Sequence, residues 1–217
     1  SDGKIRYEPM SNQTFGSENA SPVSGPLVIT ELMYHPKDDN VEFIEIKNIG
    51  SVPVDLLGTE ISGIDYRFDT PESNLVAGGI LLVVKDDPAN FRNNYNVPEE
   101  VKIYGPFLGS LDNGGERIRI RITELSTIID EPDLKVSIDI AEYSDRDPWP
   151  ISADGFGDSL HRKYPIRYAG DPGNWKAAAP SPGIIKDEEF DWRELFFNPE
   201  EIANDSLSGL SLIHISE

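Results

Sequence analysis

The sequence predicts an all-β fold, an immunoglobulin-like antiparallel β-sandwich with long loops, from three observations. First, about eight short apolar or alternating runs are separated by turn residues, which is typical of a sandwich. Second, the 18 Gly and 17 Pro are spread between these runs rather than gathered in one block. Third, three isoleucines alternate with three arginines over residues 117–122, so one strand face can pack on a core while the other meets water.

The first half of the chain supplies six expected strands. In the second of them, Ile44 and Ile46 share one face, while the polar Glu45 and Lys47 share the other. Residues 80–85 form a continuous apolar run, which predicts a strand buried on both faces. In order, the expected strands cover residues 27–34, 41–48, 54–57, 60–68, 80–85 and 101–104.

One short helix is expected between two of these strands, over residues 87–95. Asp87 can accept hydrogen bonds from the first free backbone N–H groups, so it is the expected N-cap. Pro88 follows at the first helical position, where its missing N–H costs nothing.

Two further strands, over residues 117–122 and 136–141, are expected to pair. Alternation in the second run places its apolar side chains inward and Asp139 outward. Asp139 would then pair across the strands with an arginine of the first run. Residues 123–134 form a long connection between the two. The side chains expected inward are Ile118, Ile120, Ile122, Val136, Ile138 and Ile140.

The composition excludes several classes of protein. The 19 Lys and Arg against 39 Asp and Glu give a formal charge of −20, which repels nucleic-acid phosphates and anionic lipid. The absence of Cys excludes disulfides and thiolate metal sites. No run approaches the roughly 18 apolar residues of a membrane helix, so no membrane insertion is expected.

The chain divides into three expected parts. Residues 1–25 are polar and turn-rich and are interpreted as a linker, and residues 26–184 as the sandwich domain. Residues 185–217 are an acidic tail or the start of a following segment; within 186–206, eight acidic residues stand against two basic ones. The opening Ser-Asp-Gly does not read as a natural start, so we expect a fragment of a longer protein.

Taken together and in order, seven stretches of residues 26–184 resemble the lamin tail domain family in its bacterial branch. They are 28–36 (VITELMYHP), 42–48, 54–58, 78–84, 111–116, 157–162 (GDSLHR) and 175–183 (WKAAAPSPG). The resemblance implies an immunoglobulin-like sandwich that serves as a non-enzymatic interaction or spacer module of a larger bacterial protein. It also implies an extracellular or cell-surface location and a partner that is a protein or a cell-surface polymer. The long connection at 123–134 departs from the compact family pattern.

The residues themselves offer little for catalysis, and no enzyme is expected. The chain has three His, and none lies in an HExxH or similar metal-binding pattern. Ser159 lacks the Gly-x-Ser-x-Gly elbow of serine hydrolases. His161, two residues further on, is interpreted as a structural residue at a strand end.

Calcium is the one metal for which the sequence offers ligands. Aspartates on expected loops supply the hard oxygen atoms that Ca²⁺ prefers, although none of them has EF-hand spacing. Aspartate is also an ordinary turn residue, so a solvated acidic surface without bound metal stays open as the second interpretation. The candidate ligands are Asp38, Asp39, Asp145, Asp147, Asp154 and Asp158.

Four aromatic residues of the loop-rich region 143–184 are candidate contacts for a partner: Trp149, Trp175, Tyr164 and Tyr168. Exposed and coplanar, they could stack on sugars, which would make the domain a carbohydrate-binding accessory module of a secreted enzyme. Buried, they would close the core instead. The exposure of the two tryptophans decides between these alternatives.

Overall fold

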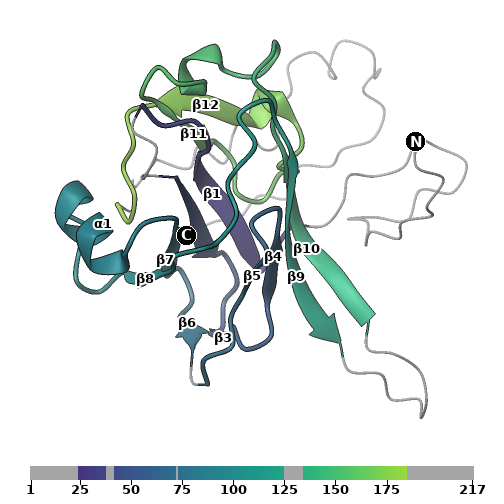
Figure 1. Cartoon of the computed structure of the whole chain (residues 1–217). Helices are drawn as coiled ribbons and strands as arrows, with labels where there is room; N and C mark the ends of the chain where they lie inside the picture. The colour runs from purple at the N-terminus through teal and green to yellow at the C-terminus, as the bar shows by residue number, and fades with distance from the viewer. Residues whose placement is uncertain (1–23, 38–41, 72, 125–133, 185–217) are drawn as a thin grey trace, which may run out of the picture. The chain divides into compact units, whose positions relative to one another are not determined.

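The computed structural model describes residues 24–37, 42–71, 73–124 and 134–184 (Figure 1). The chain divides into two units, Ser1–Ile184 and Ile185–Glu217, and all described residues belong to the first. Within them, the fold is an all-β sandwich of two main sheets with one short α-helix, so the predicted fold class is confirmed. No helix in this part of the chain is long and apolar enough to span a membrane.

The larger sheet has six strands in the order β12-β11-β1-β2-β7-β8. Strand β1 lies at its centre and pairs antiparallel with both β11 and β2. The strand bounds are β1 Leu27–Met33, β2 Phe43–Asn48, β7 Ile80–Val84, β8 Lys102–Tyr104, β11 Ser159–Arg162 and β12 Trp175–Ala178.

The second sheet has four strands in the order β10-β9-β4-β5, all antiparallel. Its strands are β4 Glu60–Ser62, β5 Tyr66–Arg67, β9 Arg117–Glu124 and β10 Leu134–Glu142. A two-stranded ribbon is formed by β3 Val54–Asp55, which precedes β4 in sequence, and β6 Asn74–Leu75, which follows β5. The strand expected over 60–68 is therefore a hairpin, which turns through Gly63 (φ +107°) and Asp65 (φ +50°).

One strand pair departs from the expected antiparallel arrangement, because β7 and β8 are parallel. Parallel neighbours need a crossover, and helix α1 Pro88–Tyr95 supplies it. The predicted cap is confirmed, since the Asp87 carboxylate accepts from the N–H groups of Ala89 and Asn90. Two 3₁₀ turns, η1 Ile151–Ala153 and η2 Pro172–Asn174, lie in the later loops.

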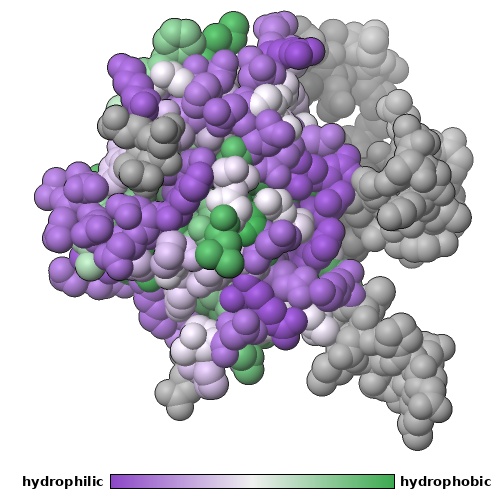
Figure 2. Space-filling view, in the orientation of Figure 1, coloured by the Kyte–Doolittle hydropathy of each residue, from purple (hydrophilic) through white to green (hydrophobic). Residues whose placement is uncertain are grey.

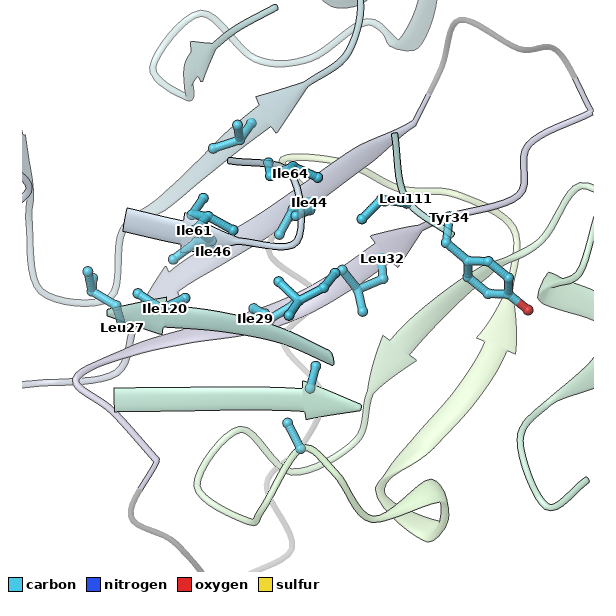
Figure 3. Close-up of a cluster of buried hydrophobic side chains, with 14 of the residues drawn as sticks. Leu27, Ile29, Leu32, Tyr34, Ile44, Ile46, Ile61, Ile64, Leu111 and Ile120 are labelled. Atoms are coloured by element: carbon cyan, nitrogen blue, oxygen red, sulfur yellow. The ribbon is translucent and has the colours of Figure 1, made fainter. Parts of the chain in front are cut away.

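The main core lies between the two sheets (Figure 3). Ile29 and Ile44 enter it from the larger sheet, and Ile61 and Ile120 enter it from the smaller one. Each of these side chains is fully buried, and such burial stabilises the fold by about 1.5–3 kcal/mol per large apolar residue. The alternation predicted for 117–122 is confirmed by this packing.

A second apolar cluster covers the outer face of the larger sheet. Phe91 of α1 packs against Phe43 of β2 with ring centroids 5.4 Å apart. Leu82 and Val84 of β7 join this cluster, whereas Leu81 and Val83 join the main core. Strand β7 is thus buried on both faces, as its continuous apolar run predicts.

The expected pairing of β9 with β10 is confirmed, but the outward position of Asp139 is wrong. Alternation breaks between Ser137 and Asp139, where the register shifts in a β-bulge. The extra residue turns the Asp139 side chain inward, where it is fully buried. Its partner is Arg162 of β11 rather than an arginine of β9.

Candidate functional site

The two tryptophans singled out in the sequence belong to the core. Trp149 is 7% exposed and Trp175 is 2% exposed, and their ring centroids lie 6.1 Å apart. The indole N–H of Trp175 donates to the carbonyl of Ala169 at 2.7 Å. Neither ring is available as a flat platform for sugars, which counts against the carbohydrate-binding alternative.

The two candidate tyrosines, Tyr164 and Tyr168, make separate contacts within one loop. Both are half-buried, and the guanidinium of Arg167 lies 4.2 Å from the centroid of the Tyr164 ring. The ring of Tyr168 lies so close to Gly170 that a Cβ there would come within 2.5 Å of it. These contacts hold the loop 163–170 in place, and a role of the two tyrosines in binding a partner stays a prediction.

Four of the six candidate calcium ligands lie in the described part of the chain, and they do not form a metal-binding group there. Asp154 binds His35 through Oδ1 and Nδ1 at 2.6 Å, while Asp145 lies 3.6 Å from Arg146. Among the described residues, no group of three or more His, Asp or Glu side chains is placed to hold a metal ion. Asp147 is exposed and Asp158 half-buried. Asp38 and Asp39 lie outside the described residues, so calcium binding stays a prediction.

The fold does bring a serine, a histidine and a carboxylate into contact. Ser159 and His161 of β11 lie on its outer face beside Glu31 of β1, and all three side chains are buried. The Ser159 hydroxyl donates to Glu31 Oε1 at 2.6 Å and lies 3.0 Å from His161 Nε2. Glu31 Oε1 lies 3.5 Å from the same Nε2.

The hydrogen bonds of this cluster differ from those of a catalytic serine and its base. A hydroxyl has one proton, and here that proton goes to Glu31, so Nε2 of His161 must donate to the serine oxygen. A general base would need the opposite polarity, with the carboxylate on the far ring nitrogen. The cluster is also covered by the chain segment 181–183.

Segment 181–183, which we call the strap, is fastened by two buried glutamates. The N–H of Ser181 donates to Glu31 at 3.0 Å, and the N–H of Gly183 donates to Glu45 at 2.8 Å. Glu31 and Glu45 are direct neighbours across β1 and β2. Charge-assisted bonds of this kind are about twice as strong as neutral ones, so the two carboxylates hold the strap to the sheet.

A buried ion pair ties the two sheets together. Arg162 Nη1 lies 2.7 Å from Asp139 Oδ2, and both side chains are fully buried. Asp139 also accepts from the N–H of Ile29, and Arg162 donates to the carbonyls of Ile29 and Arg167 and to Ser24. Three strands of two sheets, β1, β10 and β11, therefore meet at one charge pair.

Five cationic side chains gather on the outer face of the four-stranded sheet. We call it the arginine face; its residues are Arg117, Arg119 and Arg121 of β9, Arg67 of β5 and Lys135 of β10. These side chains point away from the core because the isoleucines between the arginines fill it. Figure 2 shows hydrophilic side chains along the strip where β9 and β10 run.

Three acidic side chains partly balance the arginine face. Glu60 pairs with Lys135 at 2.6 Å and with Arg67 at 3.3 Å, Asp69 pairs with Arg67, and Glu142 pairs with Arg117. The hydrogen bond from Lys135 lowers the pKa of Glu60, an effect that burial opposes and that the charges of Lys135, Arg67 and Arg121 reinforce. Among the described residues, the face thus carries five cations and these three anions on a chain of net charge −20, and Arg117 and Arg119 take part in further interactions.

One loop presents an aromatic side chain to solvent. Phe156 is 67% exposed and stands between Gly155 (φ +75°) and Gly157 (φ +104°). The loop is anchored to His35, whose carbonyl accepts from the N–H of Gly155 and whose ring binds Asp154. A Cβ at Gly155 would come within 3.1 Å of that ring, so the glycine permits the close approach.

Comparisons of the chain with family models, curated proteins and solved structures find no match. The lamin-tail resemblance therefore stays a prediction, as does the immunoglobulin-like detail of the sandwich.

Sequence reasoning missed the two glutamates that hold the strap. Their runs read as ordinary alternating strands, and nothing in the spacing indicates that residues 181–183 return to cover them. The arginine row, by contrast, was evident in the sequence as a wet strand face. What the sequence could not reveal is that Arg67 and Lys135 extend this row into a surface, because both come from other strands.

Proposed function

We propose that the domain is a non-enzymatic interaction module that binds an anionic partner through the arginine face. The observation that carries the proposal is the gathering of five cationic side chains on this one sheet face of a strongly acidic chain. The lamin-tail resemblance supports the same class of function, a lamin-tail-like, immunoglobulin-like module of a secreted or cell-surface protein.

A cationic face on an otherwise acidic chain directs an anionic partner to that face. Opposite charges attract an anionic group to this face, while the remaining surface repels it. Because the Debye length is about 8 Å at physiological ionic strength, only the charges close to the partner count. Binding is therefore local to the face in spite of the net charge.

The non-enzymatic part of the proposal rests on the buried serine cluster. Ser159, His161 and Glu31 have their hydrogen-bonding groups directed at one another and at the strap, so none is presented to a substrate. A hydrolase would need these groups at the surface with the histidine accepting the serine proton.

The test is a titration of the isotope-labelled 217-residue chain with tri-glutamate at low salt, followed by amide chemical shifts. We expect shifts at β9 and its neighbours β4 and β10. Arg121→Gln should weaken binding about two- to fivefold, since exposed ion pairs contribute about 0.5–1 kcal/mol. The matched control is Arg146→Gln, an 86% exposed arginine of a loop, which should leave the affinity unchanged. Equal losses in both variants, or no shifts at β9, would contradict the proposal.

A further inference from the structure

The turn that leads into β9 carries a pair of residues able to react with each other. Asn113 is the one asparagine of the chain that is followed by glycine, and both Asn113 and Gly114 are exposed in this turn. We propose that Asn113 is a site of spontaneous deamidation through a cyclic succinimide, and that the neighbouring Asp112 slows this reaction. The inference does not depend on the proposed function.

The reaction joins the backbone of one residue to the side chain of the residue before it. The backbone nitrogen of Gly114 loses its proton and forms a bond to Cγ of Asn113, and the side-chain nitrogen gains a proton and leaves as ammonia. Water then adds to one of the two ring carbonyls, and the C–N bond at that carbonyl breaks. Opening at one carbonyl gives aspartate, and opening at the other gives isoaspartate. Because the attack is intramolecular, it needs no further reactant besides water.

The structure leaves the attacking nitrogen accessible. Gly114 has no side chain to crowd its nitrogen, and its φ lies outside the left-handed region. A Cβ built at Gly114 would meet the Asp112 carboxylate oxygen Oδ1 at 3.3 Å and no other atom within 4 Å beyond its chain neighbours. The exposure of the turn also lets water reach the ring that forms.

Two other asparagines of the domain lack these conditions. Asn48 is fully buried, and its side-chain amide donates to the carbonyls of Val52 and Leu75, both at 2.9 Å. Asn174 is 2% exposed, and its amide donates to carbonyls of the loop 164–168. Ring closure would break these hydrogen bonds, and a bulky residue follows each asparagine. The conditions for deamidation therefore meet at Asn113 and not at these two.

Asp112 opposes the first step. The N–H of Gly114 donates to Asp112 Oδ1 at 2.8 Å, so the proton that must leave is held in a charge-assisted hydrogen bond. The deprotonated nitrogen would also carry negative charge beside a carboxylate, and like charges disfavour ionisation. Asp112 is fixed in this position, because its N–H donates to Glu116 at 2.9 Å and its carbonyl accepts from the hydroxyl of Tyr143 at 2.8 Å.

The two products should differ in stability. Both add a negative charge beside Asp112, but isoaspartate also adds a methylene to the main chain of the turn. This turn is closed by a hydrogen bond from the N–H of Gly115 to the carbonyl of Asp112 at 3.1 Å. Gly115 is packed so closely that a Cβ there would lie 2.5 Å from the carbonyl oxygen of Tyr143. The longer main chain must therefore disturb this contact, and we expect the isoaspartate form to melt at a lower temperature than the aspartate form.

The experiment incubates the full chain at mildly alkaline pH over several days and maps its tryptic peptides by mass spectrometry. We expect the amide of Asn113 to convert to the acid faster than that of Asn94, an exposed asparagine of α1 that is followed by Tyr95. Both aspartate and isoaspartate should appear at position 113. Conversion no faster than at Asn94, or aspartate as the sole product, would overturn the assignment of the site.

Three variants test the route and the role of Asp112, each compared well below its own thermal midpoint. Asp112→Ala should react about three- to tenfold faster, because the Gly114 N–H loses its charge-assisted bond. Gly114→Ala should react several-fold slower, because a Cβ crowds the attacking nitrogen. The matched control is Asp171→Ala, since Asp171 accepts from the N–H of Gly173 in the same way at 2.9 Å, and it should leave the rate at Asn113 unchanged.

Each variant can contradict one part of the inference. A rate in Asp112→Ala that is equal to or lower than that of the unaltered chain would overturn the role of Asp112. Equal acceleration in Asp171→Ala would do the same, because the effect would then not be local to the turn. An unchanged rate in Gly114→Ala would overturn the succinimide route.

Discussion

Arg162 and Asp139 are the residues whose loss should matter most for folding. A buried ion pair contributes little net stability compared with apolar residues of similar size, but removal of one partner leaves an uncompensated buried charge. Here the pair also satisfies backbone groups of Ile29 and Arg167. It therefore specifies how the two sheets meet.

We expect Asp139→Leu and Arg162→Met each to lower the free energy of unfolding by about 3–5 kcal/mol. The double variant should cost less than the sum of the two, because no charge is then left unpaired, although the Ile29 N–H still loses its acceptor. Urea unfolding of the four proteins measures this coupling. Additive costs would show that the two charges do not stabilise each other.

Tyr34 and Tyr143 form a second instructive pair of residues. Their ring centroids lie 4.5 Å apart, but within the described residues only the Tyr143 hydroxyl has hydrogen-bond partners, the carbonyl of Asp112 and the carboxylate of Glu116. Burial raises the pKa of both phenols, with Asp154 and Asp145 adding to the effect at Tyr34 and Glu116 adding to it at Tyr143.

A raised folded-state pKa stabilises the protein only while the phenol is protonated in both states. The contribution is complete below the unfolded pKa of 10.0 and is lost as the pH rises above it. We expect the thermal midpoint to fall from pH 9 to pH 11, and to fall less in Tyr34→Phe and in Tyr143→Phe. At pH 7 the two variants should differ, because only Tyr143→Phe loses hydrogen bonds, at a cost of about 1 kcal/mol. A parallel fall in all three proteins would refute this assignment.

At the scale of elements, the strap is held by contacts that are few and specific. Gly183 has φ +77°, and a Cβ there would come within 2.9 Å of Val97. Only glycine therefore fits at position 183 of the strap without strain. The two glutamates supply its charge-assisted bonds. Release of the strap should therefore need less free energy than unfolding of the sandwich.

We expect Glu45→Ala to raise the hydrogen-exchange rate of the Gly183 amide, because that amide loses its acceptor, while amides of β1 and β2 stay protected. Glu142→Ala, at an exposed position of β10, serves as the matched control and should leave the Gly183 amide unchanged. Equal exchange of Gly183 in both variants would contradict the role of Glu45.

Sequence alternation predicts the inward and outward faces of some strands but not of others. Runs with unbroken alternation were predicted with the right faces, as for Ile44 and Ile46. Two β-bulges interrupt the alternation, and the sequence pattern does not predict them. One lies between Ile29 and Glu31 and turns Glu31 to the outer face, and the other turns Asp139 inward. A bulge moves every later residue of the strand to the opposite face. Here the bulged strands are stabilised by partners distant in sequence, segment 181–183 for Glu31 and Arg162 for Asp139. No local sequence pattern reveals such partners.

At the scale of the whole molecule, the formal charge of −20 conceals an uneven distribution. The sequence supports the expectation that nucleic acid is repelled, and only the assembled four-stranded sheet reveals that five cationic side chains gather on one face. The burial of Trp149 and Trp175 likewise could not be decided from composition, because aromatic residues serve cores and binding surfaces equally well.

The place of β1 at the centre of the larger sheet has a consequence for mechanical load. Tension applied before Ser24 reaches β1 at its first residues, and β1 is bonded on both sides, to β11 and to β2, so several backbone hydrogen bonds share the load. The same tension reaches the strap through single N–H bonds to Glu45 and Glu31, which break one after another. The strap should extend first and lengthen the molecule while the sandwich stays intact.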